Sequence, residues 1–135
     1  MKSIGIRFLG IIAFALMCMA VFPQFAQAKP HITFHADHVY LNDVGRATVT
    51  GYFRNSGDKA AYVEWTEFDL EITDKQGNII WNGVAIRHYP KNIRVPSKTS
   101  IPYTFYIKSK KLPRYKKPYS WRTSNERTHW NINAG

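Results

Sequence analysis

Apolar and polar side chains alternate with a period of two along much of the chain, and this alternation limits the fold more than any other feature. In residues 46–55, Ala47, Val49, Gly51 and Phe53 share one face, while threonines, a tyrosine and an arginine share the other. Such spacing is typical of a strand with one buried face. The same alternation recurs in three further segments, residues 32–41, 63–73 and 99–108. The chain is therefore expected to be built from strands.

Turn-forming residues punctuate these segments at intervals of about ten residues. The sequence DKQG at residues 74–77 predicts a turn, and Asn82-Gly83 is the strongest two-residue hairpin signal. Pro90 and Pro96 mark loops, and Pro102 predicts an edge or strand-start position because proline cannot donate to a ladder. Short segments at residues 119–123 and 128–133 complete the pattern. Roughly six or seven such strands predict an all-β, antiparallel two-sheet sandwich.

The stretch RNSGD at residues 54–58 has two readings, a phosphate-binding loop and a turn between strands. A phosphate loop needs a following helix whose first amides face the anion. Residues 59–65 have a strand-like composition instead, and Asn, Ser, Gly and Asp are good turn formers. The turn is the expected structure, with Gly57 supplying a positive φ.

The N-terminus has the pattern of a secretory signal peptide. Lys2 and Arg7 precede an apolar run, and Ala26 and Ala28 form an Ala-x-Ala site that predicts cleavage after Ala28. An uncleaved anchor is the alternative. The domains expected are thus a signal peptide over residues 1–28 and one sandwich domain over residues 29–135, exported to the periplasm, envelope or medium. Cys18 leaves with the signal, so neither a disulfide nor a thiolate nucleophile is expected.

Charge is divided unevenly along the predicted mature chain. Residues 29–76 hold five Lys or Arg against eight Asp or Glu, whereas residues 77–135 hold twelve against one. A basic segment interleaved with tyrosine is the candidate polyanion-binding site, consisting of Lys108, Lys110, Lys111, Arg114, Tyr115, Lys116 and Lys117. Anionic envelope polymers or membrane surfaces are the expected partners, because charge would dock them while rings stack or insert. The alternative is a solvated loop that only aids solubility. Sequence-specific nucleic-acid binding is not expected, since no reading element is present.

Catalytic and metal sites are not expected, and neither is a cofactor. Glu67, Asp69 and Glu71 have the spacing of an exposed strand face, so they predict a solvent-facing acidic stripe and not a catalytic pair. No serine occupies a G-x-S-x-G elbow. His35 and His38 have opposite parity on a strand and should point to opposite faces, which argues against a shared metal unless the strand bends.

Residues 47–107 resemble small bacterial extracytoplasmic immunoglobulin-like domains. The resemblance rests on a strand with a mid-strand glycine, a turn of the N-x-G-D kind, a long strand closing on D-x-x-G-N, and a strand introduced by proline. The pattern is similar to FxLYD and SLAP domains and more distantly to the BsuPI-type proteinase-inhibitor sandwich. This resemblance implies an immunoglobulin-like sandwich that acts as a non-enzymatic envelope module, and it carries over no catalytic residue.

Two functions remain open from the sequence. The first is an exported interaction module that contacts anionic surfaces through its basic half. The alternative is a protein binder or inhibitor that uses a strand edge or hairpin loop around residues 81–84. Salt should separate them, because charge contacts weaken with ionic strength and strand pairing largely persists.

Overall fold

The computed structural model describes residues 28–43 and 45–134, and these residues form an all-β fold. The predicted signal peptide lies almost wholly outside the described residues. The seven strands are β1 (Ile32–Asp43), β2 (Arg46–Asn55), β3 (Ala61–Asp74), β4 (Ile79–His88), β5 (Arg94–Val95), β6 (Thr99–Lys108) and β7 (Tyr119–Asn131). The described part contains no helix long and apolar enough to cross a membrane.

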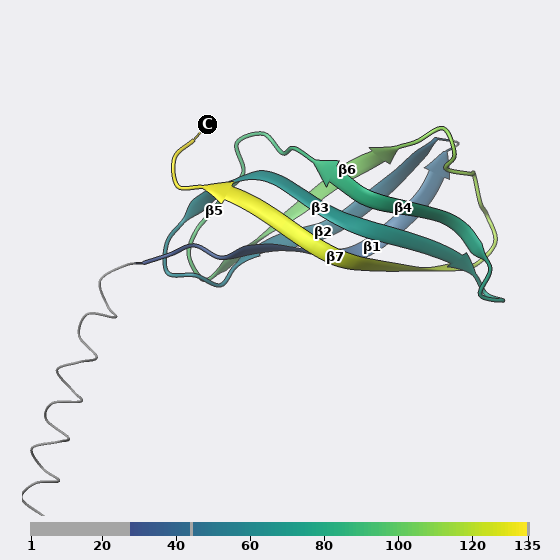
Figure 1. Cartoon of the computed structure of the whole chain (residues 1–135), viewed down its shortest axis with the longest axis horizontal. Coiled ribbons are helices and arrows are strands. Elements are labelled where there is room, and N and C mark those ends of the chain that lie inside the picture. The colour runs from purple at the N-terminus through teal and green to yellow at the C-terminus, as the bar shows by residue number, and fades with distance from the viewer. Residues whose placement is uncertain (1–27, 44, 135) are drawn as a thin grey trace, which may run out of the picture.

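Two antiparallel sheets pack face to face as a β-sandwich (Figure 1). Sheet A has the order β1-β2-β6, so β6 is an edge strand, as Pro102 predicted. In sheet B, β3 is central: β7 pairs along one side, and β4 and the short β5 share the other. Every strand lies within residues 32–131, so a protein of residues 28–135 contains the whole sandwich.

The core lies between the inner faces of the sheets and is rich in phenylalanine. The predicted inner face of β2 is confirmed, since Ala47, Val49 and Phe53 are fully buried. The ring of Phe34 contacts those of Phe53, Phe68 and Phe105, with centroids 5.1 to 6.0 Å apart. Aromatic contacts of this kind join the two sheets without a disulfide.

Side chains close both seams between the sheets. At the β1/β7 seam, the Tyr119 hydroxyl donates to the carbonyl of Val39 at 2.9 Å and accepts from the amide of Leu41 at 3.1 Å, and a carboxylate oxygen of Glu126 accepts from the amide of Phe34. At the opposite seam, a ring nitrogen of His88 lies 2.7 Å from the hydroxyl of Tyr103. Burial lowers the pKa of His88 and raises that of Tyr103, so both are neutral at physiological pH.

The turn predicted at RNSGD is confirmed, and its asparagine, Asn55, also connects separate parts of the backbone. Asn55 is fully buried; its amide oxygen accepts from the amides of His31 and Gly57, and its amide nitrogen donates to two carbonyls. Gly57 does not adopt a positive φ as predicted. It is required instead because a β-carbon there would lie 2.1 Å from the carbonyl oxygen of Lys29.

Two other local predictions were wrong. Asn82-Gly83 is not a hairpin turn: β4 runs through it, and the β3–β4 turn is formed by residues 74–78, where Asp74 accepts from the amides of Gln76 and Asn78. The register between β3 and β4 shifts between Phe68 and Leu70. Opposite this shift, Ala85 of β4 has a positive φ of 52°. The two short segments expected near the C-terminus are one long strand, β7, because both pair with β3.

Candidate functional site

The basic segment forms the β6–β7 loop, which crosses between the sheets at the end of the sandwich away from the C-terminus (Figure 1). Its six cationic side chains are exposed: Lys108, Lys110, Lys111, Arg114, Lys116 and Lys117. None of the six forms an ion pair with a carboxylate whose side chain the structure describes. The positive charge of this loop is therefore presented to solvent.

Backbone hydrogen bonds and a buried leucine fix the loop in place. The amide of Gly45, in the β1–β2 turn, donates to the carbonyl of Leu112 at 2.8 Å, and the amide of Ser109 donates to the carbonyl of Gly45 at 3.0 Å. The Leu112 side chain is fully buried in the core. The lysines on either side are thus carried by an anchored segment.

The tyrosines of this segment face inward. Tyr115 is half-buried, packs against the core, and meets the ring of Tyr119 at 6.2 Å. Tyr119 holds β1 through the two hydrogen bonds described above. Both rings support the loop from beneath, so the outermost surface of the segment is cationic.

Arg46 joins this charged end from a distant part of the sequence. It begins β2 and pairs in register with Lys108, which places two like charges on neighbouring strands. Its guanidinium lies 4.3 Å from the ring centroid of Tyr106. Sequence reasoning missed Arg46 because it stands in the acidic half of the chain. We call Arg46 together with the six exposed cations of residues 108–117 the basic end.

The predicted solvent-facing acidic stripe on β3 is wrong at Glu67, which is only 5% exposed. Arg87 on β4 lies 3.0 Å from one of its carboxylate oxygens, and Arg127 on β7 binds the other. Asp69 accepts hydrogen bonds from the Ala85 amide and the Asn125 side chain, and Glu71 pairs with Arg122 at 3.4 Å. The period-two spacing correctly placed these three carboxylates on one face of β3. It did not predict that arginines from β4 and β7 would flank β3 on both sides.

These pairs neutralise much of the charge asymmetry seen along the sequence. Burial alone would raise the pKa of Glu67, but hydrogen bonds from Arg87 and Arg127 and the charges of those arginines hold it below the ordinary value of 4.5. The pKa of Asp69 is lowered chiefly by the amide of Ala85. Arginines from the basic half of the sequence thus cover carboxylates from the acidic half, whereas the six cations of residues 108–117 pair with no carboxylate whose side chain the structure describes.

The histidines also lie differently from the expectation. An irregularity between Ala36 and His38 shifts the register, so that His35 pairs with Tyr52 and His38 with Thr50 on the same outer face of sheet A. Each ring is stacked, His35 on Tyr52 at 4.9 Å and His38 on Tyr40 at 5.0 Å. No group of three or more potential metal ligands occurs in the described ranges.

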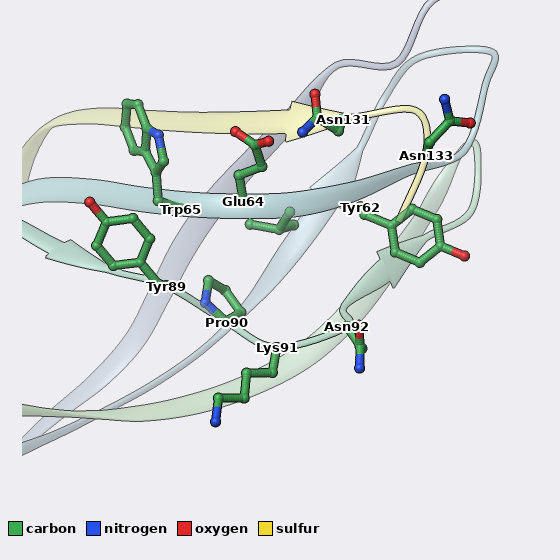
Figure 2. Close-up of a pocket in the computed structure, with 10 residues that line it drawn as sticks. Tyr62, Glu64, Trp65, Tyr89, Pro90, Lys91, Asn92, Asn131 and Asn133 are labelled. Atoms are coloured by element: carbon green, nitrogen blue, oxygen red, sulfur yellow. The ribbon is translucent and has the colours of Figure 1, made fainter. Parts of the chain in front are cut away.

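A groove of about 450 Å³ lies at the opposite end of sheet B from the basic end (Figure 2). The start of β3 contributes Tyr62, Glu64 and Trp65, and the β4–β5 loop contributes residues 89–92. Asn131 and Asn133, at and after the end of β7, complete the lining. No sequence motif predicts this groove, because its walls come together only through the pairing of β3 with β4 and β7. We call it the sheet B groove.

Glu67→Gln should lower stability at neutral pH, and the difference from the wild type should shrink in acid. The pKa of Glu67 is lower in the folded chain, so its carboxylate stabilises the fold above pH 4.5 and loses that effect as pH falls through the folded value. Urea unfolding at neutral pH and in steps below pH 4.5 measures the difference. Glu71→Gln is the control, since its partner Arg122 is 75% exposed and should contribute little. A difference that stays constant with pH would contradict this assignment.

The all-β sandwich is consistent with the family found by comparison with known proteins. A family model described as the SLAP domain matches residues 25–126, which cover strands β1 to β6 and part of β7. No curated protein matches the chain. The SLAP domain is a surface-layer-associated module and not a known enzyme family, and its association with the cell surface indicates an extracytoplasmic location. The resemblance drawn from the turn and strand motifs is therefore confirmed at the level of family. The chain belongs to the SLAP domain family.

Proposed function

We propose that this SLAP domain is a non-enzymatic, exported module that associates with the cell envelope by binding anionic polymers through its basic end. The observation that carries the proposal is an anchored cluster of exposed cations without partners among the carboxylates whose side chains are described. Elsewhere the fold pairs Arg87, Arg122 and Arg127 with β3 carboxylates.

Anchoring makes this cluster suited to binding. Lysines on an unfixed loop would lose conformational entropy on contact with a polymer, which reduces the net gain. Here Leu112 and the bonds to Gly45 already hold the backbone. Anionic groups spaced along a polymer can therefore meet several cations of one preformed surface, and the released counterions make binding salt-dependent.

The test is retention of residues 28–135 on anionic polymer purified from the envelope, on anionic liposomes and on duplex DNA, across a salt series. Changing Lys110, Lys111, Lys116 and Lys117 together to glutamine should abolish retention at moderate salt. For duplex DNA, the slope of log affinity against log salt should fall by up to roughly 3 to 4 if all four lysines contact phosphate.

A matched control separates local charge from net charge. Lys29, Lys59, Arg94 and Lys98 are exposed, lie at the other end of the sandwich and are outside the lining of the sheet B groove. Changing these four to glutamine removes the same charge and should leave most retention intact. Equal losses in the two variants would show that only net charge matters, and the basic end would then not be a site. Among the probes, the one retained at the highest salt identifies the favoured polyanion.

A second candidate function is binding of a protein strand along β4. Residues 81–84 do not form the predicted hairpin loop, but they lie in β4, which among the described strands pairs with β3 alone. The apolar side chains of Ile79 and Val84 are 61% and 73% exposed along it. An exposed edge of this kind can accept a partner strand through backbone hydrogen bonds. A protein partner retained at high salt and unaffected by the lysine changes would favour this function over the first.

A further inference from the structure

The sheet B groove combines aromatic walls with unpaired amides, and neither property follows from the basic end. Figure 2 shows Tyr89 and Pro90 from the β4–β5 loop on one side, with Glu64 and Asn131 across from them on β3 and β7. Tyr89 is 62% exposed, whereas Pro90 beside it is buried. The rim therefore offers a phenol ring on a supported backbone.

Trp65 is held rigidly at one end of the groove. The guanidinium of Arg87 lies 3.9 Å from its ring centroid, and His129 stacks at 5.6 Å with an interplanar angle of 11°. Both neighbours are fixed in turn, Arg87 by Glu67 and His129 by Glu64 at 2.6 Å. Because of these contacts, the indole is ordered before any ligand arrives, which reduces the entropy cost of binding.

Three asparagine side chains in the lining are available to hydrogen-bond with a ligand. Within the described ranges, the side chains of Asn92, Asn131 and Asn133 make no hydrogen bond to another residue, although each offers an acceptor and two donors. The single carboxylate of the lining, Glu64, is already paired with His129. Lys91 of the β4–β5 loop also lines the groove and is exposed, and its ammonium group can donate to hydroxyl groups. The lining therefore presents amide groups and one lysine beside aromatic surface.

We propose that the sheet B groove binds an uncharged oligosaccharide. Sugar rings carry apolar C–H faces and edges of hydroxyl or acetamido groups. The first suit a tyrosine ring, and the second suit planar amides that donate and accept at once. The position of Tyr89 on the rim and of Asn131 and Asn133 across the groove matches a ring lying between them. The same chain would then bind charge at one end and a neutral sugar at the other.

The test is a nuclear magnetic resonance titration of residues 28–135 with chitotetraose, the β-1,4-linked tetramer of N-acetylglucosamine. The side-chain NH₂ signals of Asn92, Asn131 and Asn133 and the indole N–H of Trp65 should shift together at millimolar ligand. Tyr89→Ala should weaken binding by about tenfold or more, as removal of a central aromatic contact commonly does. Tyr106→Ala is the matched control, since Tyr106 is 51% exposed on the outer face of sheet A.

The outcomes separate this inference from the proposed function. Binding that persists in high salt and in the lysine variant, but not in Tyr89→Ala, supports the groove as a sugar site. Absence of shifts at millimolar chitotetraose, or equal loss in Tyr89→Ala and Tyr106→Ala, overturns it. So would tighter binding at these asparagines by a proline-rich peptide, because that would assign the groove to a protein partner.

Discussion

Gly51→Ala should destabilise the sandwich by about 3 kcal/mol or more, although it adds a single methyl group. A β-carbon at Gly51 would lie 2.0 Å from the carbonyl oxygen of His35 and 3.0 Å from the α-carbon of Ala36. Both atoms belong to the backbone of β1, which cannot move without breaking the register on either side. The irregularity after Ala36 brings the two strands into this close approach. Thermal unfolding should show Tm lowered by roughly 10 °C or more.

Gly77→Ala is the control for this change. Gly77 has φ +88° and nothing within 4 Å of an added β-carbon, so the cost is local backbone strain of about 1 kcal/mol. If Gly51→Ala unfolds at the same temperature as Gly77→Ala, the strands separate more easily than the register implies.

Local patterns were sufficient to predict most of the strands. The bounds of β2 and β6 were predicted to the residue, because both alternate without interruption and each ends at a turn or loop residue. The edge position of β6 followed from Pro102. Family membership followed from the same motifs, since turn residues and a mid-strand glycine are requirements of the backbone and not of a ligand.

Pairing between distant strands could not be predicted from the sequence. Asn82-Gly83 has the composition of a hairpin turn, yet β3 supplies partners on both sides of it and tertiary pairing prevails. Glu67 had the parity of an exposed residue, but two arginines from separate strands cover it. His38 points to the same face as His35, and not to the opposite face, because the register shifts between Ala36 and His38. A bulge of this kind cannot be recognised reliably from amino-acid composition.

The candidate sites differ in the same way: a site made from contiguous residues was predicted, and sites made by pairing of distant strands were not. The cations of residues 108–117 are contiguous, so charge counting found them. Arg46 was missed because it stands in the acidic half of the chain and meets Lys108 only when β2 pairs with β6. The sheet B groove was missed because its residues meet only after β3 has paired with β4 and β7. The pairing of Arg87, Arg122 and Arg127 with β3 carboxylates is also a property of the fold, because β4 and β7 bring these arginines beside β3.

Leu112→Ala should lower both the stability of the fold and the retention of the protein on anionic polymer. Leu112 is fully buried, and truncating a buried leucine costs about 2–5 kcal/mol through lost apolar contact and the cavity left behind. The loss falls where the β6–β7 loop is anchored, so hydrogen exchange at the amides of Gly45 and Leu112 should accelerate more than exchange within β2. Retention on anionic polymer should also weaken below the unfolding temperature, although every cation is still present.

Leu112→Met tests whether anchoring, and not composition, supports binding. A volume-conserving change of this kind usually costs less than about 1.5 kcal/mol, so the loop should stay fixed and retention should be close to that of the wild type. If Leu112→Ala retains polymer as well as Leu112→Met does while its loop amides exchange freely, an ordered arrangement of the lysines is unnecessary. Binding would then depend on local charge density alone, and the anchoring by Gly45 and Leu112 would serve the fold and not the surface contact.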